Sequence, residues 1–450
     1  MSTPVQSPTG SASRPARLLD FLAEFLPGLL VALAILPLVI RGGSYAPWVP
    51  QTTDLEVYVY AAADLLAGKD VYQTQSPLGL WFIYPPVAAI LMIPLVVGPY
   101  VVWQAVWTAL LVLAQNSVLK RCGVPRGWKL AVVSIALIIA MEPIRTTLGY
   151  GQVNTLLMSL VIADLLPDRG TGSEAQETSG TGRWLPQGTL LGLAAAIKLT
   201  PMLFVVFALV LGRRAPQLRQ VALRALISFS VLGLTGLVLQ PSGTLTFVTK
   251  VLTGDTYGNP VYVGNQSLGA VFARTWPSVA DPVTGAAKQG IGGLVAGAVV
   301  ALIALYVARQ LWHRGDRVLA VGIVGMATCL ASPIAWTHHH VWLVPMALGL
   351  IGSTVPLVMR IALAGWALWN AVGPVLAFLP YGNNIELTYQ PWQRLVANFG
   401  PLFGTATLVV MALWLLRGLW LLRGTRHAGP DMVGERAVSG TMPGGTAVAG

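Results

Sequence analysis

The sequence predicts an all-α polytopic membrane protein, a bundle of helices that crosses a lipid bilayer many times. Only 10% of the 450 residues are charged and 55% are hydrophobic, with a mean hydropathy of +0.67, whereas ordinary soluble domains carry about 25% charged residues. The apolar residues form long stretches separated by short basic runs. Because those runs form no continuous stripe, the formal net charge of +11 indicates membrane topology, and nucleic acid is not an expected partner.

Thirteen apolar segments are candidates for membrane spans. They occupy residues 22–41, 81–97, 100–119, 130–147, 151–167, 184–198, 200–212, 219–240, 290–312, 317–335, 341–359, 361–379 and 400–421. A full crossing needs about 20 apolar residues, and several early segments are shorter. Basic runs mark the cytoplasmic side, so both termini are expected there. Two cytoplasmic termini require an even number of crossings, and we therefore expect about 12 transmembrane helices with short re-entrant or broken segments.

The chain divides into one membrane domain and two tails. The expected parts are a cytoplasmic N-terminal tail (1–21), a transmembrane domain (22–421) and a disordered cytoplasmic tail (422–450), and within the domain a first outer loop (42–80), a disordered cytoplasmic linker (168–183) and a later outer loop (241–289). In the first outer loop, the run from Leu55 to Leu66 has the spacing of an amphipathic helix, which we expect to lie on the membrane surface.

Charged and amide side chains within apolar stretches point to a cavity inside the membrane domain. Glu142 and Arg145 interrupt one stretch, Gln152 and Asn154 follow directly, and Lys198 lies between two others. Placing a charge at such depth costs roughly 2.5–3.5 kcal/mol on insertion scales, and such residues usually line cavities. A snorkelling Lys198 or a structural Glu142–Arg145 pair would account for the same residues without a function.

Further polar residues fall in the outer segments. One segment contains Asn265, Gln266 and Arg274, and another contains Trp336 followed by three consecutive histidines, 338–340. Consecutive residues on a helix point about 100° apart, so three neighbouring imidazoles do not readily share one metal ion. Hydrogen bonding of the histidines to a bound anion or hydroxyl is therefore favoured over a metal site.

One carboxylate of the first outer loop, which contains Asp54, Glu56, Asp64 and Asp70, in the company of cations and amides fits the transfer of a sugar from a lipid phosphate. A phosphate departs as an anion, so it needs positive charge and hydrogen-bond donors rather than a second acid. The remaining task is to deprotonate the acceptor hydroxyl, for which one carboxylate suffices, whereas glycoside hydrolases need two. Asp54 or Glu56 could be this base, and the two could instead hold a divalent cation together; no other cofactor is expected. Asp54 could also serve as the N-cap of the helix beginning at Leu55.

A membrane transporter or flippase of a lipid-linked sugar is the alternative function. Broken helices with polar residues at mid-membrane are also typical of transporters. The motifs here are biased outward and no internal repeat is evident, which favours an enzyme. A catalytically inactive scaffold is a third hypothesis, and the presence of Asp54 argues against it.

The order of several short motifs resembles glycosyltransferase family 87, the polyprenyl-phosphate-mannose-dependent α-1,2-mannosyltransferases of actinobacteria. The motifs are Thr53-Asp54-Leu55-Glu56-Val57-Tyr58, Gly68-Lys69-Asp70-Val71-Tyr72, Phe82-Ile83-Tyr84-Pro85-Pro86, Gly151-Gln152-Val153-Asn154, Lys198-Leu199-Thr200-Pro201, Asn265-Gln266-Ser267, and Ser332-Pro333 with Trp336, His338 and His339. The likeness extends over about residues 50 to 345. The prolines after Tyr84 could instead serve only to begin a span.

The resemblance implies a GT-C fold in the plasma membrane with its active site facing the periplasm. It implies a polyprenyl-phosphate-mannose donor, a mannosylated membrane lipid as acceptor and an α-1,2 product formed with inversion. Phosphatidylinositol mannoside, lipomannan and other cell-envelope glycans are all compatible acceptors, and an arabinose donor stays open. By the resemblance Asp54 matches the catalytic aspartate. The expected ligands of the donor phosphate or sugar are Lys198, Arg274, His338, His339, Gln152, Asn154, Asn265 and Gln266, with Tyr84, Trp336, Glu142, Arg145 and Glu56 as secondary candidates.

Overall fold

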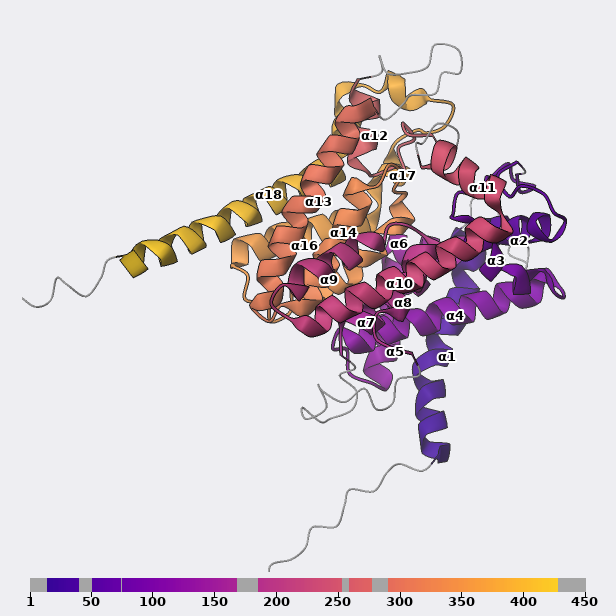
Figure 1. Cartoon of the computed structure of the whole chain (residues 1–450), viewed down its shortest axis with the longest axis horizontal. Coiled ribbons are helices and arrows are strands. Elements are labelled where there is room, and N and C mark those ends of the chain that lie inside the picture. The colour runs from indigo at the N-terminus through magenta and orange to yellow at the C-terminus, as the bar shows by residue number, and fades with distance from the viewer. Residues whose placement is uncertain are drawn as a thin grey trace, which may run out of the picture.

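The computed structural model describes residues 14–39, 51–73, 75–167, 185–252, 259–276 and 290–427 (Figure 1). Within these residues the chain is helical, and the only extended pairings are two isolated bridges, Gln75 with Trp81 and Asn265 with Trp336. The all-α prediction is confirmed for this part of the chain. The predicted linker 168–183, the chain beyond residue 427 and residues 1–13 lie outside the described residues.

The described residues form a succession of helices. In chain order they are α1 (Arg14–Val39), α2 (Thr53–Leu66), α3 (Pro86–Leu91), η1 (Ile93–Val96), α4 (Tyr100–Arg121), α5 (Trp128–Ala140), α6 (Glu142–Tyr150), α7 (Asn154–Leu165), α8 (Thr189–Ile197), α9 (Met202–Gly212), α10 (Pro216–Leu239), α11 (Pro241–Thr246), η2 (Phe247–Val251), α12 (Leu268–Thr275), α13 (Gly290–His313), α14 (Arg317–Ala331), η4 (Thr337–Trp342), α15 (Leu343–Gly349), α16 (Leu357–Val372), α17 (Pro374–Phe378), η5 (Ile385–Thr388) and α18 (Pro391–His427).

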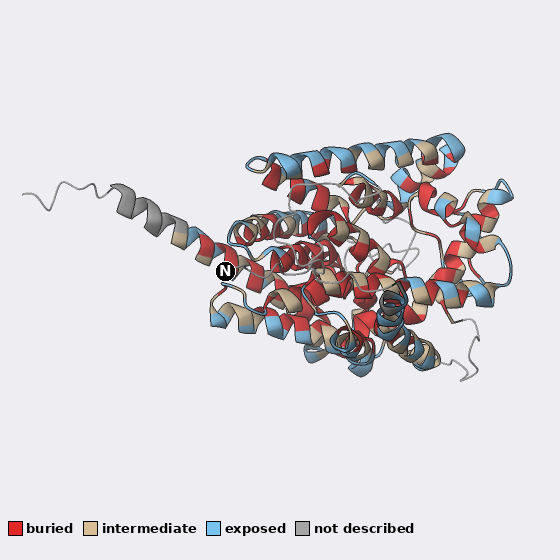
Figure 2. Cartoon of the chain, turned by 90° about the horizontal axis from the view of Figure 1, so that it is seen from below, coloured by how far each residue is buried: buried red, intermediate tan, exposed pale blue. Residues whose placement is uncertain are grey.

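Five of the described helices are long and apolar enough to cross a membrane. They are α1, α4, α10, α13 and α18, and the bent pair α5 and α6 would make a sixth. Large apolar side chains are exposed on these helices, including Ile227 and Val238 of α10, at 63% and 75%. Such surfaces need an apolar solvent, so the structure indicates a polytopic membrane protein. Figure 2 shows the buried residues gathered inside the bundle and the exposed ones on its outer helices.

Helices α5 and α6 meet at a bend of 84°. Met141 between them is extended (φ −99°, ψ 112°), and Pro143 lacks the N–H that a continuous helix would require. Helix α6 then ends at Gly151, whose φ of +67° is a left-handed conformation that favours glycine. A Cβ at Gly151 would lie 2.8 Å from Leu55 Cβ. The bend therefore brings the chain after Gly151 directly against the start of α2.

The helix predicted over Leu55 to Leu66 is confirmed as α2, which begins two residues earlier. Leu55, Tyr58, Ala61 and Ala62 form its buried face. Thr52 occupies the N-cap position, so the alternative in which Asp54 caps this helix is wrong. Asp54 instead lies in the first turn, where the partial positive charge of the helix N-terminus favours a carboxylate.

Helix α14 forms the centre of the core, and every residue from Val318 to Leu330 is buried. Gly322 faces the backbone of α15, where an added Cβ would come within 2.3 Å of Met346 N. Glycine thus allows the two backbones to approach closely, as it commonly does between membrane helices. This close packing fixes α15, and with it the turn η4 that directly precedes α15 and contains the three histidines.

Candidate active site

A hydrogen-bonded cluster surrounds Asp54 at the start of α2. Gln152, between α6 and α7, donates from Nε2 to Asp54 Oδ2 at 3.1 Å. Its Oε1 accepts from the Tyr58 and Tyr84 hydroxyls, each at 2.7 Å, and from the Val153 N–H at 3.0 Å. A backbone N–H can only donate, so this contact fixes the orientation of the Gln152 amide and turns its NH₂ group toward Asp54.

Tyr58 is a residue that the sequence reasoning did not select. It is fully buried, its ring meets that of Tyr84 edge-on at 5.3 Å, and the two hydroxyl oxygens lie 3.1 Å apart. The spacing could have identified it, because Tyr58 lies four residues after Asp54 and therefore on the same face of the helix. Together the two tyrosines hold the amide of Gln152 in place beneath the carboxylate.

Burial raises the pKa of Asp54 from its ordinary value of 3.8 to about 7, although the positive charge of Lys198 and the hydrogen bond from Gln152 offset part of the rise. A carboxylate with a pKa near the working pH is well suited to accept a proton from a hydroxyl. Glu56 lies two residues further along α2 and so on a different side of the helix. The geometry thus separates the two carboxylates that could otherwise have shared a cation.

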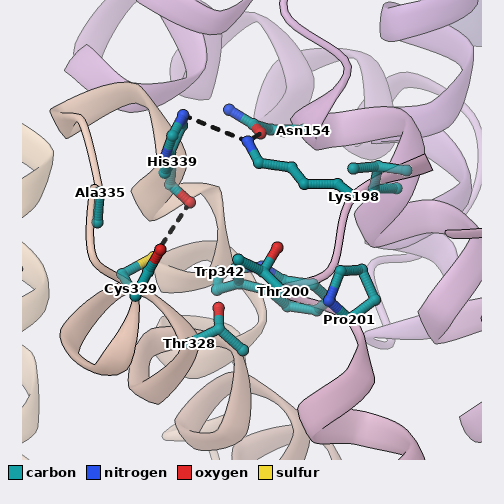
Figure 3. A pocket seen from close by; sticks show the side chains of 11 residues that line it. Asn154, Lys198, Thr200, Pro201, Thr328, Cys329, Ala335, His339 and Trp342 are labelled. Carbon is teal, nitrogen blue, oxygen red and sulfur yellow. Dashed lines mark hydrogen bonds between the residues drawn. The ribbon is translucent and has the colours of Figure 1, made fainter. Parts of the chain in front are cut away.

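Lys198 occupies the break between α8 and α9. Its backbone is extended (φ −148°, ψ 133°), which directs the side chain away from the helix axis and into a pocket (Figure 3). Nζ donates to Asn154 Oδ1 at 3.0 Å and lies 3.3 Å from His339 Nε2. It also lies 5.5 Å from the centre of the Tyr84 ring, in a cation–π contact. Lys198 is thus linked both to the histidine turn and to the cluster around Asp54.

The three consecutive histidines point in different directions from the 3₁₀ turn η4. His339 faces the pocket, the ring of His338 packs edge-on against Tyr150 at 5.2 Å, and His340 Nδ1 lies 3.3 Å from the Trp336 carbonyl oxygen. In the described part of the chain, no group of three or more His, Cys, Asp or Glu side chains is arranged to hold a metal ion. His339 is therefore the histidine whose ring can contact a bound ligand.

The backbone of the histidine turn is clamped by α6 and α7. The His338 carbonyl oxygen accepts hydrogen bonds from Thr147 Oγ1 at 2.8 Å and from Asn154 Nδ2 at 2.9 Å. Asn154 thus bonds to the turn through one amide atom and to Lys198 through the other. Burial and the charge of Lys198 hold the pKa of His339 well below its ordinary range, so its neutral ring can accept a hydrogen bond from the ammonium.

Two adjoining cavities share Lys198, Thr200, Thr328, Ser332 and His339 in their walls. The smaller one holds about 20 Å³ and is the pocket seen in Figure 3. The larger one holds about 490 Å³, and its remaining walls are mostly apolar. These walls are formed by Ile83, Pro85, Leu199, Met202, Leu203, Val206, Phe247, Val251, Leu252, Ala301, Ala331, Pro333 and Ile334. The arrangement is a mostly apolar groove with a cation and an imidazole in its wall.

The profile of glycosyltransferase family 87 matches residues 82–333 of this chain. The chain belongs to glycosyltransferase family 87. It is 31% identical over 331 residues, 71% of the chain and 74% of the relative, to a polyprenol-phosphate-mannose-dependent α-(1-2)-phosphatidylinositol pentamannoside mannosyltransferase of Mycolicibacterium smegmatis.

Two further relatives of this family 87 chain give a similar result. A pentamannoside mannosyltransferase of Mycobacterium tuberculosis is 31% identical over 404 residues, 85% of the chain and 86% of the relative. A polyprenol-phosphate-mannose-dependent α-(1-2)-phosphatidylinositol mannoside mannosyltransferase of M. smegmatis is 29% identical over 399 residues, 81% of the chain and 84% of the relative. No solved structure matches the chain significantly.

In this family 87 chain, Arg274 lies apart from the two cavities around Lys198. Its side chain is completely buried, and burial lowers its pKa to about 10, so it stays charged at neutral pH. Nε donates to Asn398 Oδ1 at 2.9 Å, and the other nitrogens donate to the carbonyl oxygens of Asn265 at 2.9 Å, Tyr262 at 3.2 Å and Ala397 at 3.4 Å. Its donors are thus directed at the protein itself.

Asn265, Gln266 and Trp336 also lie outside the walls of the cavities at Lys198. Asn265 Oδ1 accepts from the Ala335 N–H at 3.0 Å, and the Gln266 N–H donates to the Ala335 carbonyl oxygen at 2.7 Å. The ring of Trp336 packs edge-on against Tyr262 at 5.4 Å. These contacts fix the segment that leads into the histidine turn.

Glu142 and Arg145 do not form an ion pair with each other. Glu142 Oε1 accepts from the hydroxyls of Thr146 and Thr337, both at 2.9 Å, while Arg145 Nη1 donates to the Ile139 carbonyl oxygen at 2.6 Å. The alternative of a structural Glu142–Arg145 pair is therefore wrong. Through Thr337, Glu142 instead holds the first residue of the histidine turn.

Proposed function

We propose that the chain transfers mannose from polyprenyl-phosphate-mannose to a mannosyl hydroxyl of a phosphatidylinositol mannoside, forming an α-1,2 linkage. The observation that carries the proposal is one buried carboxylate, Asp54, whose pKa is near 7 and which interacts electrostatically with Lys198, a cation in the wall of a mostly apolar cavity. The names of the family relatives support the same donor and acceptor.

The donor lipid occupies the apolar groove. Isoprenoid units match the aliphatic and aromatic walls of α9, η2 and α13, because burying apolar area contributes about 25 cal/mol per Å². The phosphate lies at Lys198 and His339, where a charge-assisted hydrogen bond from the ammonium contributes about 1.5–3 kcal/mol. The sugar then projects past Tyr84 toward Asp54.

Asp54 acts as the general base in a single displacement. The acceptor hydroxyl oxygen attacks the anomeric carbon of mannose, its proton passes to Asp54, and the bond from that carbon to the phosphate oxygen breaks. The leaving polyprenyl phosphate keeps the bonding electron pair, and Lys198 stabilises the negative charge that develops. One displacement inverts the anomeric centre, so a β-linked donor gives an α-linked product.

The active site faces the periplasm, and both termini face the cytoplasm. The support is the distribution of basic residues, which cluster at Lys120 to Lys129, Arg213 to Arg219 and His313 to Arg317, because short basic loops favour the cytoplasmic side. About 12 crossings are compatible with two cytoplasmic termini. They would include the bent segment at Met141 and the shorter apolar helices α7, α9, α14 and α16.

The test is mannose transfer by the purified chain in lipid vesicles. We expect radiolabelled mannose to move from decaprenyl-phosphate-mannose to a phosphatidylinositol mannoside and to be released again by an α-1,2-specific mannosidase. A nucleotide-linked mannose serves as the control donor and should give no product. Movement of the labelled donor across the vesicle membrane without any glycoside product would refute the proposal and support a flippase.

A further inference from the structure

A third cavity lies at the far end of α2 from Asp54. It holds about 480 Å³, and four polar residues that line it are Lys69, Asp70, Gln240 and Ser242, with Ile90 and Leu239 among its apolar walls. Figure 1 places α2 and α3 beside α11 at one end of the molecule. The cavity is therefore separate from the two that meet at Lys198, and it has no place in the step proposed above.

The polar side of this cavity suits neutral hydroxyl groups better than an anion. Asp70 is held in position, since Oδ1 accepts from the Tyr72 N–H at 3.0 Å and Oδ2 from Thr246 Oγ1 at 3.4 Å. The ammonium of Lys69 lies 3.6 Å from Asp64 Oδ1. Asp64 thus offsets the charge of the ammonium, and the other charged residue in the cavity wall is the carboxylate of Asp70, which disfavours a phosphate. Carboxylate, amide and hydroxyl groups above an apolar floor are instead suited to sugar hydroxyls and ring faces.

One short helical segment contributes wall residues to both this cavity and the donor groove. Pro241 and Ser242 at the start of α11 line the third cavity, while Phe247 and Val251 of the following π-helical turn η2 line the groove. Unusual π-helical turns occur often at functional sites. The segment formed by α11 and η2 thus lines two cavities, and a transferase binds two substrates, a donor and an acceptor.

The third cavity is linked to the proposed base by a rigid helix of known length. Leu65, at the cavity, follows Asp54 by eleven residues of α2, which corresponds to about 16 Å at the rise of an α-helix. A bound group at the cavity would therefore lie several sugar units from the hydroxyl that reacts at Asp54.

We propose that this cavity is an acceptor subsite that binds sugar units of the mannosylated lipid remote from the new bond. The proposal rests on the proposed function, because it needs a mannosyl acceptor at Asp54. It makes acceptor length a determinant of affinity: a long oligomannoside reaches both Asp54 and the cavity, whereas a single mannoside reaches Asp54 alone.

The test compares two phosphate-free acceptors, methyl α-mannoside and a linear tetramannoside, in the purified full chain. We expect the KM for the tetramannoside to rise about fivefold in Gln240→Ala and in Ser242→Ala, since each loses about one hydrogen bond, while kcat and the KM for methyl α-mannoside stay unchanged. Ser242→Trp, which fills the cavity, should remove the preference for the longer acceptor. Thr235→Ala, on α10 outside the cavity, is the matched control.

The outcomes distinguish this proposal from the function on which it rests. Absence of transfer to a phosphatidylinositol mannoside, assayed in parallel with the unmodified chain, would count against the proposed function itself. Transfer to that lipid with none to either phosphate-free acceptor would overturn the subsite alone. Equal changes with both acceptors, or none with either, would overturn the subsite while leaving the function intact. An effect seen only with a phosphate-bearing lipid acceptor would also overturn it, because it would identify a site for the anionic headgroup.

Discussion

Replacing Asp54 by asparagine should remove activity and at the same time stabilise the protein. The new amide oxygen can still accept the hydrogen bond that Gln152 donates to Asp54 at 3.1 Å, so the cluster is expected to stay intact. An amide cannot take up the proton, and loss of a general base slows a reaction by about 10²–10⁴-fold. The substitution should thus lower the transfer rate and raise the stability of the fold, and a residue with only a structural role would not produce both changes.

The expected stabilisation follows from the pKa of Asp54, which rises from 3.8 to about 7 on folding. A raised carboxyl pKa means that the folded state favours the protonated form, so ionisation destabilises the fold. This cost is absent below pH 3.8, grows as the pH rises toward 7 and is complete above pH 7. It corresponds to at most about 4 kcal/mol in total, and to about 2–3 kcal/mol between pH 5 and pH 8.

The assay combines transfer rates with thermal unfolding of the detergent-purified protein at pH 5 and pH 8. We expect Asp54→Asn to raise the apparent melting temperature more at pH 8 than at pH 5. In the parent chain, kcat/KM should fall about tenfold per pH unit below pH 7. Glu56→Gln is the matched control: it should keep its activity and should stabilise the fold less than Asp54→Asn, because burial raises the pKa of the less buried Glu56 in the same direction. Near-normal transfer by Asp54→Asn with loss in Glu56→Gln would move the base to Glu56, and near-normal transfer by both would refute the single-carboxylate mechanism.

Three further substitutions test the surroundings of Asp54. Lys198→Met should raise the KM for the donor by roughly ten- to a hundredfold. It should also move the acid limb of the pH profile to higher pH, because the charge of Lys198 lowers the pKa of Asp54. An unchanged donor KM would exclude Lys198 from the phosphate site, and Lys129→Met is the exposed control. Tyr58→Phe removes one hydrogen bond to Gln152 and should reduce kcat by roughly three- to tenfold, measured under saturating donor; an unaltered kcat would show that Gln152 is held without it. Arg274→Gln and Arg274→Lys should both lower the melting temperature, because neither supplies the forked donors that reach three carbonyl oxygens. If Arg274→Lys instead kept the parent melting temperature and changed only the donor KM, Arg274 would be a ligand of the phosphate.

The sequence by itself determined the class of protein, the position of several helices and the family. Hydropathy is a sum over neighbouring residues, so long apolar stretches such as those in α10 and α13 can be recognised without tertiary contacts. The run from Leu55 to Leu66 could be predicted as a helix for the same reason, since its pattern is local. The break at Lys198 was also visible, because a charge and Pro201 interrupt apolar residues on both sides.

Only the tertiary structure decided which of the selected polar residues meet. Lys198 and His339 lie 141 positions apart in the sequence and 3.3 Å apart in space, and Gln152 reaches Asp54 across 98 positions. Arg274 carries the same kind of charge as Lys198, yet its donors are taken up by the carbonyl oxygens around it. The direction in which a buried side chain donates depends on groups supplied by distant segments, and a local sequence pattern does not contain that information.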